Sequence, residues 1–163
     1  MAVLDSYLAE AERARAGARD QPNWLMTARR HALERFREVG FPTLHDEEWR
    51  FTSVASIAET PFALGQDGAS QLSATDLERF QLPEETAASL VFVNGRYAEM
   101  ASDLRRVPRG VSIDSLSRVV AEPANAIHSY LTRVATVERN PFTALNTAFL
   151  LDAAVVERLG IVR

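Results

Sequence analysis

Apolar residues recur every three or four positions through the first forty residues, which predicts two amphipathic helices. The first is expected over residues 2–18, where leucines and alanines share one face. The second is expected over residues 24–39 and has the wider apolar stripe. That stripe consists of Trp24, Leu25, Ala28, Ala32, Leu33, Phe36 and Val39. We expect the second helix to form the centre of the core, with Leu25, Ala32 and Phe36 largely buried.

Stop signals follow the second helix directly. Gly40 predicts a helix cap with positive φ, and Pro42 prevents the helix from resuming. Phe41 is expected to fold back onto the last helical turn, as the hydrophobic contact that accompanies such caps. A further short helical turn is expected over residues 46–49.

The apolar period changes from helical to extended at residues 90–97. Asn94-Gly95 lies there between β-rich flanks, which is typical of a hairpin with a type I′ turn. Extended segments are also expected at residues 111–113 and 153–156. Together these patterns predict an α+β fold, mainly α-helical, with a small antiparallel β-hairpin or sheet.

Two more helix starts are predicted between the helical and extended segments. Ser73 and Asp76 have the spacing of a capping box and should begin a short helix that runs through Phe80 and is ended by Pro83. Asp114 is predicted to cap another short helix, which runs to Val120.

Proline marks the start of each of the last two predicted helices. Pro123 suits a first helical turn, and Asn140-Pro141 repeats that pattern. The inward positions expected for the earlier helix are Ile127, Leu131 and Val134. Those expected for the later helix are Phe142, Leu145, Phe149 and Leu150.

Charge and hydropathy narrow the classes of partner. The 163 residues carry a formal net charge of -4, which gives no electrostatic reason to expect a nucleic-acid partner. Apolar runs fall short of a membrane span, and the first twenty residues lack the basic start of a signal peptide. We therefore expect a cytoplasmic protein that binds neither nucleic acid nor membrane.

Two residue types are absent, and each absence excludes a kind of chemistry. The chain has no cysteine, so it offers neither a thiolate for an iron–sulfur cluster nor a disulfide. It has no lysine either, since all eighteen basic residues are arginines, which excludes a P-loop lysine and a Schiff base. We expect no cofactor in this chain and no enzymatic activity.

Candidate functional residues gather between residues 45 and 51. His45-Asp46-Glu47-Glu48 contains metal-ligand side chains, but consecutive residues point in different directions and no second cluster completes a shell. A solvated acidic turn is therefore the favoured interpretation. Trp49, Arg50 and Phe51 follow it, and this trio either anchors the loop on the second helix or contacts a partner protein.

Three separated segments carry a family resemblance. They are Gly40–Thr52, with the pattern Gly-Phe-Pro-Thr…Glu-Trp-Arg-Phe-Thr, then Leu90–Tyr97 and Asn140–Phe149. In this order they resemble the N-terminal region of the SufB/SufD family, and of its SufD members in particular. That family supplies scaffold subunits of the SufBCD iron–sulfur cluster assembly complex.

The resemblance implies an architecture and a set of partners. Family members have a helical N-terminal domain, a central β-helix that pairs with SufB, and a C-terminal segment that docks on the ATPase SufC. By this comparison residues 1–151 form the N-terminal helical domain and residues 152–163 a truncated start of the β-helix core, with Gly160–Arg163 as an interrupted end. The β-helix core itself is expected to be absent, and no functional residue of the family can be carried over by position.

Two functions are open at this point. The favoured one is a non-catalytic scaffold or interaction domain of an assembly complex of the SufBCD type. The alternative is a small stand-alone metal-dependent domain or enzyme that uses the His45–Glu48 region.

Overall fold

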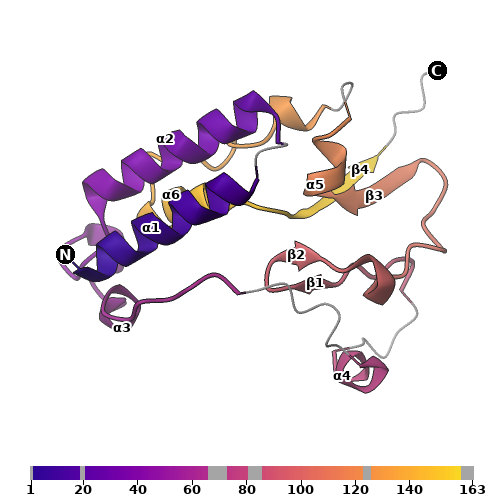
Figure 1. The fold of residues 1–163 in the computed structure, drawn as a ribbon, viewed down its shortest axis with the longest axis horizontal. Coiled ribbons are helices and arrows are strands. Elements are labelled where there is room, and N and C mark those ends of the chain that lie inside the picture. Colours follow the sequence, from indigo (N-terminus) through magenta and orange to yellow (C-terminus); the bar gives the residue numbers. More distant parts are fainter. Residues whose placement is uncertain (1, 19–20, 66–72, 81–85, 123–125, 159–163) are drawn as a thin grey trace. The chain divides into compact units, whose positions relative to one another are not determined.

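The chain begins with a run of helices, and strands and further helices follow, which gives the α+β fold expected from the sequence (Figure 1). The computed structural model describes residues 2–18, 21–65, 73–80, 86–122 and 126–158. Two units each combine two separate stretches of sequence. The first unit is Met1–Leu64 with Pro123–Leu150, and the second is Gly65–Glu122 with Leu151–Arg163.

The first unit is built on α2 (Asn23–Val39), the helix with the widest apolar stripe. Leu25, Ala32 and Phe36 are each 0% exposed, which confirms the predicted centre of the core. Gly40 ends the helix with a φ of 65°, and its N–H donates to the Phe36 carbonyl at 2.8 Å.

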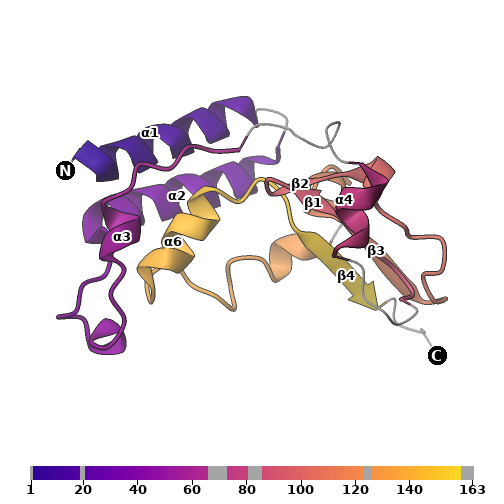
Figure 2. The same cartoon turned by 90° about the horizontal axis from the view of Figure 1, so that it is seen from below.

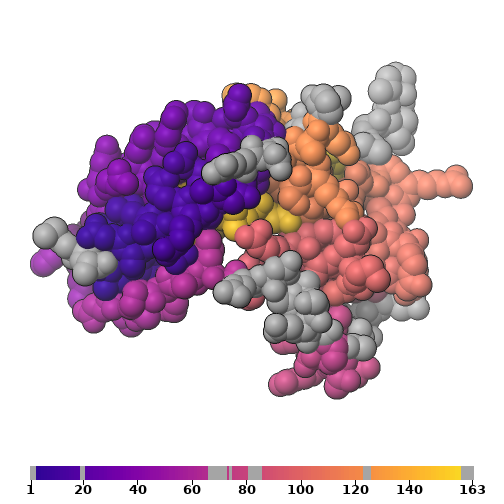
Figure 3. Space-filling model, viewed as in Figure 1, coloured from indigo at the N-terminus to yellow at the C-terminus, as the bar shows by residue number. Residues whose placement is uncertain are grey.

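Helix α1 (Ala2–Gly17) packs against α2, and both lie on the face of the first unit seen in Figure 3. The sequence pattern identified its small apolar residues but missed Tyr7. The Tyr7 ring is buried, and its hydroxyl donates to the carbonyls of Ile57 and Thr60, 3.1 Å from each. These bonds join α1 to α3 (Ala55–Ala58) and to Thr60, two residues after it.

Aromatic rings close the core at the end of α2. Phe41 folds back as predicted, with its ring centroid 5.0 Å from that of Phe36 and 5.1 Å from that of Tyr7. The buried residues of this core are Tyr7, Leu8, Ala11, Ala32, Leu33, Phe36, Val137, Ala144 and Ala148. The cap at Gly40 therefore directs the following chain across the core instead of away from it.

Helix α6 (Pro141–Ala148) begins as the sequence predicts. The Asn140 side chain accepts from the N–H groups of Phe142 and Thr143, and Pro141 occupies the first turn. Its fully buried face differs from the predicted stripe and consists of Ala144, Thr147 and Ala148. The predicted residues Phe142, Leu145, Phe149 and Leu150 are half-buried. Small side chains let the backbone of α6 approach α2 closely.

Arg29 lies in this helix contact, which the sequence does not predict. Its side chain is 1% exposed, with Nε donating to the Ala148 carbonyl at 3.3 Å and Nη1 to the Gln21 side chain at 2.8 Å. Burial, and secondarily the charge of Arg15, lower the pKa of the Arg29 guanidinium. Its Nη2 has no hydrogen-bond partner within the part of the chain that is described.

The predicted helix after Pro123 is wrong in its described part. Residues 123–125 lie outside the described ranges, and Ile127–Ser129 form one turn of 3-10 helix, η4. Turns follow, and Val134, expected inward, is 89% exposed. Without a continuing helix, the three-to-four spacing does not bring these side chains to one face.

The second unit contains the predicted hairpin. Strands β1 (Phe92–Val93) and β2 (Arg96–Tyr97) are antiparallel, with Phe92 opposite Tyr97 and Val93 opposite Arg96. Asn94 has a φ of 51° and Gly95 a φ of 77°. Two positive φ values in a two-residue loop are those of a type I′ turn, so the prediction is confirmed.

A second antiparallel pair joins β3 (Val111–Ser115) to β4 (Ala154–Arg158). The expected strand at residues 111–113 continues through Asp114, which is therefore not the cap of the next helix, α5 (Leu116–Val119). Ser115 occupies the cap position instead. The expectation for Gly160–Arg163 lies outside the described residues.

Short elements complete the fold (Figure 2). They are η1 (Glu47–Trp49), α4 (Ala74–Glu78) and η3 (Glu99–Ala101). The capping box of α4 is present as predicted, since Ser73 and Asp76 each accept a hydrogen bond from the other's backbone N–H. Pro83, expected to end this segment, lies outside the described residues. Among the described helices, none has the length and apolar character that crossing a bilayer requires.

The hairpin turn leads to a stability prediction. Replacing Gly95 with valine should lower the free energy of unfolding by about 1–2 kcal/mol, because a β-branched residue is strained at positive φ. Apart from its two chain neighbours, no described residue comes within 4 Å of an added Cβ there, so the loss would come from the backbone alone. Gly17→Val, at the end of α1 and also in open space, is the matched control. Urea unfolding measures both, and equal stabilities would contradict the turn assignment.

Candidate protein-interaction site

The segment after α2 makes its own folded base. The Asp46 carboxylate accepts from the Thr43 N–H at 2.7 Å and from the Thr43 hydroxyl at 3.0 Å. The Thr43 hydroxyl in turn accepts from the His45 N–H. The bonds from Thr43 lower the pKa of Asp46, so its carboxyl is ionised at neutral pH. The 3-10 helix η1 begins directly after this turn.

Trp49 anchors the segment to the first unit. Its ring centroid lies 5.3 Å from that of Phe142, at the start of α6, and the side chain is half-buried. The sequence offers the second helix as an anchoring surface, and the ring contact of Trp49 in the structure is with Phe142 of α6. Phe142 is within reach because Phe41 already packs beside it, with centroids 6.0 Å apart.

Arg50 and Phe51, which follow Trp49, are both exposed. Phe51 is 87% exposed, and the Arg50 guanidinium carbon lies 4.6 Å from the centre of its ring. Arg50 also pairs with Glu47 at 3.2 Å. An arginine held by a carboxylate thus covers one face of an exposed aromatic ring, an arrangement favourable to contact with another protein.

The acidic residues of this segment are not arranged as a metal site. Asp46 uses one carboxylate oxygen in the turn with Thr43, and Glu47 pairs with Arg50. No group of three or more potential metal ligands comes together within residues 2–18, 21–65, 73–80, 86–122 and 126–158. The structure therefore gives no support from geometry to a metal centre at His45–Glu48.

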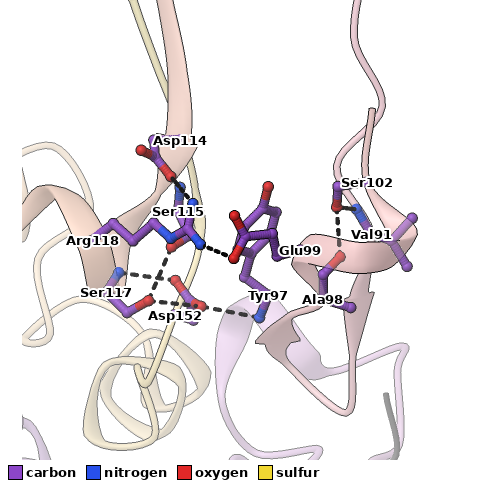
Figure 4. Close-up of polar contacts among 10 residues, drawn as sticks. All are labelled: Val91, Tyr97, Ala98, Glu99, Ser102, Asp114, Ser115, Ser117, Arg118 and Asp152. Atoms are coloured by element: carbon purple, nitrogen blue, oxygen red, sulfur yellow. Dashed lines mark hydrogen bonds and ion pairs between the residues drawn. The ribbon is translucent and has the colours of Figure 1, made fainter. Parts of the chain in front are cut away.

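The second unit contains a polar network that the sequence did not predict, centred on Asp152 (Figure 4). Its Oδ1 accepts from the N–H groups of Ser117 at 3.0 Å and Ala153 at 2.9 Å. Its Oδ2 accepts from the Tyr97 N–H at 3.0 Å and the Ser117 hydroxyl at 3.2 Å. One carboxylate thereby joins the hairpin, the first turn of α5 and the start of β4.

Arg118 extends this network along α5. It pairs with Glu99 and, at 3.9 Å, with Asp114, and its guanidinium lies 5.1 Å from the centre of the Tyr97 ring (Figure 4). The bond to Glu99 raises the pKa of Arg118. The ten residues of Figure 4 include serine hydroxyls but neither histidine nor cysteine. Several of these contacts join different elements of the unit, so the network holds their backbone segments together.

The comparisons with known proteins agree with one another. Residues 4–157 match the family model described as the SufBD protein N-terminal region. The iron-sulfur cluster assembly SufBD family protein slr0076 of Synechocystis sp. is 30% identical over 132 residues.

The alignment with that relative covers 81% of this chain but 28% of the relative, so the chain spans less than a third of the relative's length. The comparison with solved structures found no match. Since the family model covers almost all of the sequence, the chain belongs to the SufBD family of iron–sulfur cluster assembly proteins, through the family's N-terminal region.

Proposed function

We propose that this chain is a non-catalytic scaffold and interaction domain of an assembly complex of the SufBCD type. It takes the SufD position in that complex, with SufB and SufC as partner subunits, in the cytoplasm. Residues 152–163 are proposed as the start of the β-helix core that follows the N-terminal domain of residues 1–151.

The match of residues 4–157 to the SufBD family is the observation that carries this proposal. The use of polar side chains supports it. In the second unit Asp152 bonds to backbone N–H groups and to Ser117, and Arg118 pairs with the carboxylates of Glu99 and Asp114. In the first unit the buried Arg29 bonds to the end of α6. These groups stabilise the fold, as expected of a domain that presents surfaces.

The iron–sulfur cluster is the cargo of such a complex, and we propose that its thiolate ligands come from outside the 163 residues of this chain. The chain contains no cysteine, so it cannot contribute a thiolate. The domain's contribution is then to hold partner subunits in place.

Co-expression tests the proposal. The full-length protein is produced with the SufB-type and SufC-type subunits of the same organism and analysed by size-exclusion chromatography and mass spectrometry. We expect one complex that contains all three proteins, and ATP hydrolysis that depends on the SufC-type subunit. Failure to bind either subunit would contradict the scaffold role. A metal-dependent activity of the isolated protein, lost in Glu47→Gln/Glu48→Gln, would favour the stand-alone enzyme instead.

A further inference from the structure

We propose that the segment Thr43–Ser53, the docking loop, binds an apolar pocket rimmed by basic side chains on a partner protein. Phe51 enters the pocket and Arg50 packs at its edge. The inference rests on the proposed scaffold function and adds to it the contact surface and the chemistry of the partner.

The base of the docking loop is ordered before any partner binds. Asp46 closes the turn on Thr43 with two hydrogen bonds, and Trp49 packs on Phe142 of α6. A preformed loop loses little conformational entropy when it binds, so more of the contact energy remains as affinity. The anchor also fixes the direction in which the next two residues leave the first unit.

The tip of the docking loop exposes apolar surface that the described residues of its own unit leave open to solvent. Phe51 is 87% exposed, although burying a phenylalanine is worth roughly 1.5–3 kcal/mol. Arg50 covers one ring face and is held in place by Glu47. Aromatic and arginine side chains dominate the binding energy of protein interfaces, and here the two types are adjacent and preassembled.

The charge around the tip selects the partner. Between Thr43 and Ser53 the loop has three carboxylates, at Asp46, Glu47 and Glu48, and one arginine. All three acidic residues are exposed. A complementary surface therefore carries basic side chains around its apolar pocket. The same charge repels nucleic acid and anionic lipid, so the partner is a protein.

Affinity measurements with the full-length protein test the inference. Binding to the purified SufB-type and SufC-type subunits is measured by calorimetry for the wild type and for Phe51→Ala. We expect the variant to lose at least tenfold in affinity for one of the two subunits. Phe80→Ala is the matched control, because Phe80 is 82% exposed at the end of α4, and its affinity should be unchanged. Thermal unfolding checks that both variants remain folded.

The charge argument has its own measurement. Glu47→Gln/Glu48→Gln should bind the same subunit less tightly than the wild type. Its affinity should also fall less steeply as salt concentration rises. If the affinity of the double variant depends on salt as steeply as that of the wild type, the proposal of basic side chains around the pocket is overturned.

Crosslinking identifies the surface that is contacted. Benzoylphenylalanine at position 51 should crosslink, on irradiation, to a peptide of the partner subunit that contains apolar and basic residues. Crosslinks solely to a second copy of this chain would overturn the proposal in favour of self-association.

The two failures can be distinguished. If the wild type binds a subunit and Phe51→Ala binds it equally well, the proposed role of the docking loop is wrong and the scaffold function stands. If the wild type binds neither subunit, the scaffold function fails and the docking loop fails with it.

Discussion

Replacing Phe36 with alanine is expected to lower the free energy of unfolding by about 3–5 kcal/mol. The ring is fully buried in α2, with Phe41 packed edge-on against it. Its removal leaves a cavity lined by helices that cannot all move inward, so the loss exceeds the transfer energy of the side chain alone. Urea unfolding followed by circular dichroism measures the change.

An exposed phenylalanine provides the control for this variant. Phe80→Ala removes the same atoms from a side chain that is 82% exposed, and should change stability by less than about 0.5 kcal/mol. If Phe36→Ala is no less stable than Phe80→Ala, the core is not centred on α2.

Replacing Asp152 with alanine is the second change with a large expected effect. Its carboxylate accepts four hydrogen bonds, three of them from backbone N–H groups. Their loss leaves the half-buried N–H groups of Tyr97 and Ala153, and the donors of the exposed Ser117, without this partner. We expect a loss of about 2–3 kcal/mol, measured as a lower midpoint of thermal unfolding.

Two asparagine variants test whether the loss of stability is specific to the hydrogen bonds of Asp152 or follows from replacing any aspartate by asparagine. Asp152→Asn keeps the shape, but its amide group opposes a backbone N–H on one side, so about half of the loss should remain. In Asp103→Asn the lost contacts are to Arg105, two residues away on an exposed turn. That variant should unfold like the wild type, and an Asp152→Asn protein that does the same would show that the network adds nothing to stability.

Elements fixed by neighbouring residues could be predicted from the sequence. The Asn94-Gly95 turn, the cap at Gly40 and the Asn140-Pro141 helix start each depend on the conformational limits of one or two residues. Such limits act locally, so they are readable without knowledge of the fold. Helix α2 could also be predicted, because its apolar residues repeat with the helical period along its whole length.

Features set by distant contacts could not be predicted. Asp152 is distant in sequence from two of the groups that it binds, and a lone aspartate has no pattern that indicates such a role. The periodicity of α2 predicts that its charged residues face solvent. Arg29 instead donates a hydrogen bond to the Ala148 carbonyl at the end of α6. The prediction that Val134 points inward was wrong, because apolar spacing alone does not produce the helix that would bury this side chain.

The candidate site was partly accessible from sequence. Trp49, Arg50 and Phe51 were singled out as a group, because aromatic residues around an arginine are common in interfaces. Their separate positions depend on tertiary packing. Phe142 supplies the anchor for Trp49 from almost a hundred residues later in the chain, and no local rule connects the two.

The pairing of α2 with α6 has a consequence for how the protein is made. Arg29 and its acceptor at Ala148 are 119 residues apart, and most of the second unit is synthesised between them. On the ribosome, α1 and α2 emerge early but expose the surface that α6 will cover. That apolar face has no intramolecular partner until α6 has been synthesised, and during this interval it is exposed to non-native contacts.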